Sequence, residues 1–377
     1  MKKTLLATAI AGALGVSAAA QAATVYDQDG TQIDIYGRIN FAVTAGGVDD
    51  AKFDGFDADG NPVLVQTEKT SGSEFRDVNS RIGFRARHQL SSDLQAFGNV
   101  ELRPRMDAVN DDGITVRNTF VGLNSNQFGM VRVGNFDSVF YSAVTSMFDV
   151  PEWGGYTTLD GGSISSRGDS VQYSTPNLEG FQAHVSVKHL SGNGQDIGEQ
   201  DNSSTVSAAG AVSYEIDGLY LAAGYNQSKD VSRETDRGAS YDGGAAYAGG
   251  EDIWGVSARY AFTPALSARL TYQEVASQFD QATLEEQKNP HRLIENLWGL
   301  GATFDYGMGE VYADYYRVRM ALDQIDSQNR WNVGVNYRFS EPMYVYAEIW
   351  DTDFDTDDSV SDLNDDLGYA VGIRYDF

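Results

Sequence analysis

The sequence predicts an all-β fold, an antiparallel transmembrane β-barrel of about 16 strands with an inward-folded constriction loop. Apolar and polar side chains alternate along most of the chain. The alternating runs last about ten residues. The connections between successive runs are alternately short and long. Outside the N-terminal segment, no stretch sustains the 3.6-residue period of an amphipathic helix.

The alternation gives each predicted strand one apolar and one polar face. In RWNVGVNYRF (330–339) and LGYAVGIRYDF (367–377), apolar or aromatic residues occupy every second position. A soluble sandwich buries such faces between two sheets, whereas a membrane barrel turns them toward lipid and encloses water. Strand length favours the barrel, because soluble strands average about 5–6 residues and membrane strands need about 9–11.

The first 22 residues have the features of a secretory signal peptide. Lys2 and Lys3 precede an apolar run from Thr4 to Val16, and Ala20-Gln21-Ala22 has the form of a cleavage site. The apolar run is shorter than the roughly 20 residues that span a bilayer as a helix. We therefore expect a signal peptide at 1–22 and a single barrel domain at 23–377.

Connections of two lengths alternate along the predicted barrel. The short ones are 91–93, 124–127, 175–180, 215–218, 263–265, 306–309 and 340–342. The long ones are 44–77, 104–112, 137–167, 191–204, 229–250, 276–294, 320–328 and 353–365. An even number of strands places both chain ends on the short-turn side, and the last strand must pair with the first, Gln32 to Val43. Unpaired backbone groups cannot face hydrocarbon, so closure is required.

Composition excludes several classes of protein. The formal net charge is −27, and nucleic-acid binding requires a basic face. The chain has no cysteine, which removes disulfides and thiolate metal sites. No cofactor is implied, and an acidic surface suits cations as partners.

One long connection, residues 139–167, differs from the others because it contains apolar and aromatic residues. Such residues need something to pack against, and about sixteen strands leave an aqueous lumen that could receive them. Folded inward, this segment would narrow the lumen and place Asp149 and Glu152 of DVPEWGG in it.

Arginines fall on the inward face of the first predicted strands. Ile35, Gly37 and Ile39 face outward on the first strand, which directs Arg38 inward. Acid on the loop and arginines on the wall would create an electric field across a narrow water column. The same alternation places inward Arg38, Arg81, Arg85, Arg87, Glu101 and Arg103, with Arg117 at the start of the fourth strand and Arg167 at the end of the loop.

The chain resembles the general diffusion porins of Gram-negative outer membranes, the trimeric type of enteric and vibrio-like bacteria. The resemblance covers the whole chain after the signal segment. The matching stretches are IDIYGRINF (33–41), SRIGFRARHQLSSDLQAFGNVEL (80–102), TVRNTFVGL (115–123), DVPEWGG (149–155) and RYDF (374–377).

The resemblance implies a location in the cell outer membrane and a set of pore residues. Its basic wall positions fall on Arg38, Arg81, Arg117 and Arg167, its wall acid on Glu101 and its loop acid on Glu152. A second loop acid falls one position away, on Asp149. The implied partners are two further copies in a homotrimer, outer-membrane lipid and lipopolysaccharide, small hydrophilic solutes, and the insertion machinery, which would read Tyr375 and Phe377 as an assembly signal.

The predicted function is a passive, weakly cation-selective channel for small hydrophilic solutes and ions, and not an enzyme. A sugar-specific channel is the alternative, since Tyr344, Tyr346 and Trp350 could form part of an aromatic track. A barrel enzyme is disfavoured because no histidine accompanies a G-x-S-x-G motif. A lectin-like sandwich or adhesin is disfavoured by strand length.

One stretch departs from the pattern. In GEVYADYYRVRM (309–320), either register directs Asp314 or Arg317 toward lipid. A β-bulge, or a face covered by a neighbouring subunit, would explain the exception.

Overall fold

The computed structural model describes most of the chain outside the signal segment and the longer connections. The described residues are 22–46, 52–56, 62–65, 72–108, 113–160, 168–190, 205–227, 251–276, 293–321, 326–351 and 367–377. The first strands are β1 (Ala23–Gln28), β2 (Thr31–Gly46), β3 (Lys52–Phe56), β4 (Pro62–Val65), β5 (Ser73–Asp77), β6 (Arg81–Gln89), β7 (Leu94–Pro104), β8 (Ile114–Val116), β9 (Thr119–Ser125) and β10 (Gly129–Phe136). The others are β11 (Gly168–Ser174), β12 (Phe181–Leu190), β13 (Thr205–Ile216), β14 (Leu219–Asn226), β15 (Ile253–Ala261), β16 (Leu266–Val275), β17 (Ile294–Asp305), β18 (Glu310–Met320), β19 (Gln328–Ser340), β20 (Met343–Asp351) and β21 (Gly368–Asp376).

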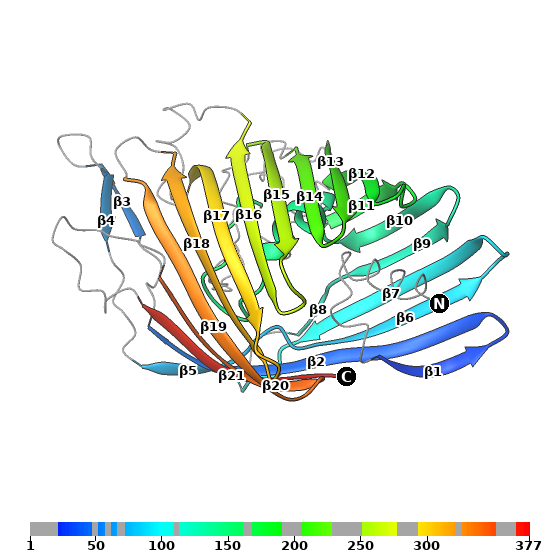
Figure 1. Cartoon of the computed structure of the whole chain (residues 1–377), viewed down its shortest axis with the longest axis horizontal. Helices are drawn as coiled ribbons and strands as arrows, with labels where there is room; N and C mark the ends of the chain where they lie inside the picture. Colours follow the sequence, from blue (N-terminus) through cyan, green and yellow to red (C-terminus); the bar gives the residue numbers. More distant parts are fainter. Residues whose placement is uncertain are drawn as a thin grey trace.

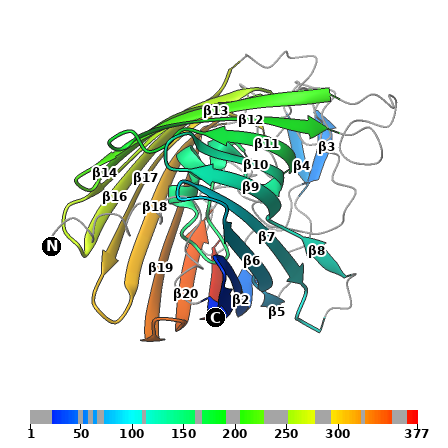
Figure 2. The same cartoon turned by 90° about the vertical axis from the view of Figure 1, so that its right-hand side faces the viewer.

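These strands form a closed, 16-strand antiparallel barrel, as the sequence predicts (Figures 1 and 2). Two barrel strands are each interrupted once, so that β5 continues into β6 and β8 into β9. The barrel closes where β21 pairs with β2, from Arg38 opposite Asp376 to Gly46 opposite Gly368. β1 pairs with the start of β2, and β3 pairs with β4 outside the main sheet.

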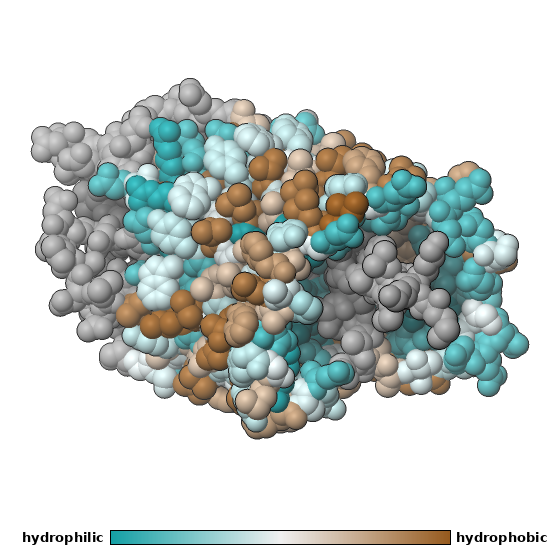
Figure 3. Space-filling model, viewed as in Figure 1, coloured by the Kyte–Doolittle hydropathy of each residue, from teal (hydrophilic) through white to brown (hydrophobic). Residues whose placement is uncertain are grey.

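The apolar faces of the strands point outward, and the polar faces point inward. On β19, Val333 and Val335 are exposed, while Asn332 and Asn336 on either side of them are buried. Figure 3 shows apolar side chains gathered over the outer face of the strands turned toward the viewer. The predicted direction of the two faces is therefore confirmed. Within the described ranges, no helix is long and apolar enough to cross a bilayer.

The irregular stretch on β18 has one inward acid and one outward arginine. Asp314 points inward and forms an ion pair with Arg269 of β16, with N and O 2.7 Å apart. Arg317 points outward, where its Nη1 donates to the side-chain oxygen of Asn329 at 2.8 Å. A bulge in the neighbouring strand β17 shifts the register between Ile294 and Asn296. This bulge lies opposite Arg319 and Met320, and β18 itself alternates regularly through Asp314 and Arg317, so it does not account for the outward arginine. A face covered by a neighbouring subunit stays a prediction.

Several strand boundaries differ from the sequence prediction. The connection predicted at 44–77 contains β3 and β4, and β5 at its end is part of the barrel wall. The first barrel strand, expected at Gln32 to Val43, extends over Thr31–Gly46. Arg117 lies in the interruption between β8 and β9, and does not begin a strand. At this interruption, the carbonyl of Asn118 accepts a hydrogen bond from the side-chain amide of Asn99 at 2.5 Å.

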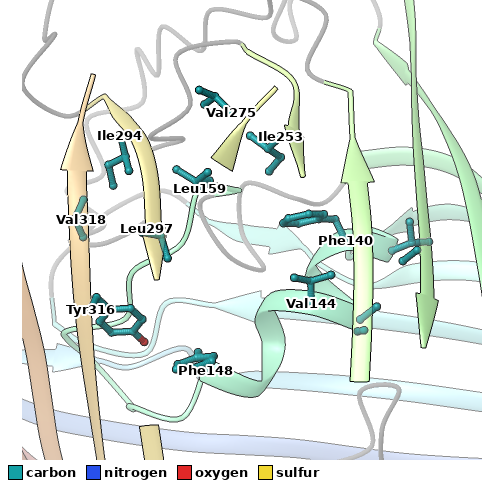
Figure 4. Close-up of a cluster of buried hydrophobic side chains, with 14 of the residues drawn as sticks. Phe140, Val144, Phe148, Leu159, Ile253, Val275, Ile294, Leu297, Tyr316 and Val318 are labelled. Atoms are coloured by element: carbon teal, nitrogen blue, oxygen red, sulfur yellow. The ribbon is translucent and has the colours of Figure 1, made fainter. Parts of the chain in front are cut away.

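A hydrophobic cluster lies on the inside of the barrel wall. After β10 the chain forms two short helical turns, η2 (Tyr141–Thr145) and η3 (Ser146–Phe148), within what we call the inner segment, residues 138–160. Figure 4 shows Phe140, Val144, Phe148 and Leu159 of this segment meeting wall side chains. These wall side chains include Ile253, Val275, Ile294, Leu297, Tyr316 and Val318.

Candidate functional site

The inner segment docks on a wall of small side chains. Phe140 and Val144 lie over Gly224 of β14, where an added Cβ would come within 3.1 Å and 3.0 Å of them. Gly255 of β15 leaves similar room for the Phe140 ring, 3.1 Å from an added Cβ. Small residues at these inward positions therefore allow a bulky loop to lie flat against the strands.

Hydrogen bonds from the wall satisfy the backbone of the helical turn. The hydroxyl of Tyr220 donates to the carbonyl of Ala143 at 2.9 Å, and Ser257 Oγ donates to the carbonyl of Val144 at 2.6 Å. A buried backbone carbonyl without a partner is unfavourable by about 1–3 kcal/mol, so these contacts specify where the turn sits.

Phe148 occupies the centre of the docked segment. Its ring lies 5.7 Å from the ring of Tyr316 and 5.4 Å beneath the guanidinium of Arg269. Further along, Gln273 Oε1 accepts hydrogen bonds from Thr158 Oγ1 and from the N–H of Leu159, both at 2.9 Å. The segment is thus fixed to β16 and β18 as well as to β14 and β15.

The PEWGG turn is shaped by its two glycines and by a wall glutamate. An added Cβ on Gly154 would lie 2.3 Å from the Trp350 ring, and Gly155 has a positive φ of 86°. Glu348 of β20 accepts the N–H groups of Glu152 at 2.5 Å and of Trp153 at 3.0 Å. A side chain at either glycine would prevent this close approach, which explains the motif.

Glu152 is held by side chains from three neighbouring strands. Its carboxylate accepts from Asn40 Nδ2 of β2 at 3.0 Å, from Arg374 Nη1 of β21 at 2.8 Å, and from the hydroxyl of Tyr344 of β20. Only 11% of its side chain is exposed. Burial raises the pKa of the Glu152 carboxyl above its ordinary value of 4.5, and the positive charge of Arg38 opposes this rise.

Asp149 precedes the turn and is exposed. Its carboxylate accepts a hydrogen bond from the hydroxyl of Tyr141, within the same inner segment. The nearby charges that act on it are those of Arg117, Asp137 and Arg38. The inner segment therefore presents one carboxylate fixed to the wall and a second one open to water.

Three of the sequence-predicted arginines lie together on the wall and are paired with acids. Arg38 Nε lies 2.9 Å from Asp376 Oδ1. Glu101 Oε1 lies 3.3 Å from Arg117 Nη1 and 4.0 Å from Arg81 Nη1. The carboxylate of Glu101 thus lies near two arginines, one on each side of strand β7.

The secondary arginines are less uniformly paired. Arg87 Nη2 lies 2.8 Å from Asp34 Oδ2, and the guanidinium of Arg85 stacks 4.9 Å from the centre of the Tyr36 ring. Within the described ranges, the buried Nε of the Arg103 side chain has no hydrogen-bond partner. Arg167 lies outside the described residues.

The C-terminal residues complete the barrel. The Phe377 N–H donates to the carbonyl of Gly37 at 3.0 Å, and the Gly37 N–H donates back at 2.7 Å. Tyr375 is exposed on the outer face, with its ring 6.0 Å from that of Phe377.

Sequence reasoning missed several residues of the site, all on inward positions. Arg374 and Asp376 are the charged inward residues of the last strand, and pairing with β2 brings them to Asn40 and Arg38. Arg76 of β5 lies 5.1 Å above the Trp153 ring. Strand alternation would have placed each of them in the lumen, but their proximity to the PEWGG turn follows only from barrel closure.

A closed barrel with apolar residues outside and charged residues inside is a membrane channel of the type that crosses by strands alone. The chain belongs to the Gram-negative porin family, whose model matches residues 7–359. It is a diffusion channel of the bacterial outer membrane.

Individual relatives and structures agree with this assignment. The chain is 28% identical to a monosaccharide porin of a Halomonas species, and 26% identical to outer membrane porin F of Salmonella typhimurium strain LT2. Both alignments cover 100% of each chain. The fold matches that of the OmpF–daunomycin complex of Salmonella typhi with a TM-score of 0.64, at 20% identity, over 94% of this chain and 100% of that one.

Proposed function

We propose that the channel passes small hydrophilic solutes and ions passively, with a weak preference for cations, and that the inner segment is its constriction. The observation that carries the proposal is the path of the inner segment. Its apolar side chains contact β13 to β18, and its Glu152 reaches β20, β21 and β2. A segment in contact with the inner face of so many strands reduces the open cross-section along its whole length.

The proposed constriction consists of charged groups from the wall and from the inner segment. These groups are Arg38, Arg81, Glu101, Arg117, Asp149 and Glu152, and Arg167 completes the set that the family resemblance implies. Arg85, Arg87 and Arg103 line the lumen beside them. Fixed charges of both signs orient water in the narrow region, which favours polar solutes over apolar ones.

The total charge of the protein supports a preference for cations. The formal net charge of −27 becomes −29 when Lys2 and Lys3 leave with the signal peptide. Acid in excess around the openings raises the local concentration of cations. The preference should weaken at high salt, because screening shortens to about 3 Å at 1 M.

Reversal potentials test this proposal. Purified protein in a planar bilayer between unequal KCl solutions should give stable single-channel steps and a reversal potential favouring potassium. The potential should decrease as both solutions are made more concentrated at a fixed ratio. A clear preference for chloride would refute the selectivity, and the absence of conductance steps would refute the channel.

A second candidate, a sugar-specific channel, is favoured by the similarity to the monosaccharide porin of Halomonas. The aromatic residues that suggested a sugar track have other contacts here. The Tyr344 hydroxyl donates to Glu152, the Tyr346 hydroxyl donates to Asn40 at 3.0 Å, and Trp350 packs against Gly154. Liposome swelling decides between the two, since saturable glucose uptake indicates a sugar site, whereas uptake of glucose and of glycerol set by size alone indicates passive diffusion.

The family resemblance also supports a homotrimer, cleavage after Ala22, contact with lipopolysaccharide, and recognition of Tyr375 and Phe377 by the insertion machinery. Mass spectrometry of the membrane-extracted protein tests cleavage through the mass of the chain beginning at Ala23. Light scattering in detergent tests the trimer, and a monomeric mass would contradict it.

A further inference from the structure

The barrel strand formed by β5 and β6 contains one residue more than the strand that it faces. Phe41 of β2 pairs with Asp77, and Arg38 of β2 pairs with Arg81. Between these pairs β2 has two residues, whereas the facing strand has three, Val78 to Ser80. An extra residue on one strand of a pair forms a β-bulge, which re-aims the side chains around it. We call residues 78–80 the wall bulge.

The extra residue changes which positions of the strand point inward. In an uninterrupted strand, residues five positions apart point to opposite faces of the sheet. The guanidinium of Arg76 nevertheless lies 5.1 Å from the centre of the Trp153 ring in the inner segment. Arg81 Nη1 lies 4.0 Å from Glu101 Oε1 on the next strand of the wall. Both arginines therefore point into the barrel, and without the wall bulge one of them would face lipid.

One unusual backbone conformation and two side-chain hydrogen bonds hold the wall bulge in shape. Asn79 has a positive φ of 61°, a conformation that asparagine tolerates and that β-branched residues avoid. Asp77 Oδ1 accepts the N–H of Ser80 at 2.8 Å, and Asp77 Oδ2 accepts the N–H of Met106 at 2.7 Å. The wall bulge is thus fixed to the chain that follows β7.

The wall bulge is also joined to the inner segment, through Asn40 of β2. The N–H of Val78 donates to the carbonyl of Asn40 at 2.8 Å, and the N–H of Asn40 donates to Ser80 Oγ at 3.0 Å. The side chain of Asn40 donates from Nδ2 to Glu152 and accepts from the Tyr346 hydroxyl, both at 3.0 Å. The same three residues therefore set the direction of the wall arginines and support the residue that holds the carboxylate of the inner segment.

We propose that Asn79 and Ser80 are positioning residues of the channel. Neither carries a charge, and their role is to direct the Arg81 charge inward and to hold Asn40 against Glu152. The interaction of a fixed charge with a passing ion depends on the distance between them, so a displaced charge changes selectivity as a removed charge does. The proposal rests on the proposed constriction and adds the residues that determine its geometry.

Substitutions at Asn79 test the proposal, because they change the backbone preference without changing a charge. Asn79→Gly retains access to positive φ, whereas Asn79→Val disfavours it. In planar bilayers, Asn79→Gly should keep the potassium-to-chloride permeability ratio of wild type, and Asn79→Val should change the ratio about twofold. The matched control is Gly307→Val in the turn between β17 and β18, where φ is 94° and an added Cβ has nothing within 4 Å. It places the same side chain at a positive φ and should leave the ratio unchanged.

A second substitution separates positioning from general stability. Arg81→Gln removes the charge that the wall bulge directs inward, and in the wild-type background it should move the permeability ratio about twofold toward potassium. In the Asn79→Val background the same substitution should have less than half of this effect, because the arginine is no longer at its place. A loss of stability alone would leave the effect of Arg81→Gln equal in the two backgrounds.

The outcomes separate this inference from the channel function. Equal permeability ratios in Asn79→Gly and Asn79→Val, or an equal effect of Arg81→Gln in both backgrounds, would overturn the positioning role and leave the channel intact. A wild-type protein without conductance steps would contradict the proposed function itself. If Asn79→Val forms no channels, Ser80→Ala replaces it, since it removes the acceptor of the Asn40 N–H. A wild-type ratio in Ser80→Ala is then equally decisive against the proposal.

Discussion

The inner face of the barrel has two regions that strand alternation alone would make equivalent. The covered wall, β13 to β18, has small or apolar inward residues such as Ala211, Ala222 and Gly224, and the inner segment lies on it. The open wall, β2 and β5 to β9, has arginines and Glu101. The comparison teaches that inward positions are mostly small or apolar where another part of the chain packs on them, and that the charges kept there, Arg269 and Asp314, are paired with each other.

The largest expected effect concerns the buried ion pair on the covered wall. Arg269→Met leaves the carboxylate of Asp314 buried without its cation, and we expect the free energy of unfolding to fall by about 3–5 kcal/mol. Denaturant unfolding in detergent measures the loss. Adding Asp314→Leu should recover most of it, because both charges are then absent.

The matched control is Arg259→Met. Arg259 lies 3.8 Å from Glu215, and both side chains are more than a third exposed, so we expect a loss under about 1 kcal/mol. An Arg269→Met variant no less stable than Arg259→Met would contradict the contrast between the two sites.

A second change separates the inner segment from the covered wall. Phe148→Ala removes a fully buried ring and should weaken docking of the inner segment by about 3 kcal/mol. Amide exchange across residues 139–160 should accelerate, and single-channel current should become noisier. Phe128→Ala, whose ring is 68% exposed, is the control and should change neither. Equal exchange in the two variants would show that the ring does not hold the segment.

The third change acts on the charge that joins the inner segment to the open wall. Glu152→Gln removes one negative charge, which at about 7 Å in water is equivalent to roughly 0.6 kcal/mol, a two- to threefold change in relative ion permeability. We expect the permeability ratio to move toward chloride, with an altered conductance. Glu341→Gln, in an exposed turn, is the control. If recordings of Glu152→Gln match those of wild type, Glu152 is not part of the constriction.

The smallest expected effect is the pH dependence of the same carboxylate. Burial raises the pKa of Glu152, so the group takes up its proton as the pH falls toward and through a value above 4.5. Acidification therefore removes the negative charge, and the reversal potential should move toward chloride. The part of this change in reversal potential that is due to Glu152 should be absent in Glu152→Gln. Identical pH titrations of the two proteins would show that another group causes the change.

Much of the fold was predictable, because alternation is a local property of sequence. It placed Arg38 and Glu101 inward, and it anticipated closure of the last strand on the first. It could not show that Arg374 meets Glu152, because that contact joins residues distant in sequence and forms only when the barrel closes. The sequence also could not show why Gly224 and Gly255 are glycines, since they leave room for the ring of Phe140, which is distant in sequence.

The alternation of outward and inward residues also bears on how the protein reaches its destination. An outer-membrane protein must first pass through the inner membrane, where a continuous run of about 20 apolar residues would be retained as a helix. The strands here interrupt their large apolar residues with small or polar residues at most second positions. The small and polar residues that line the lumen thus also prevent the unfolded chain from being retained in the inner membrane.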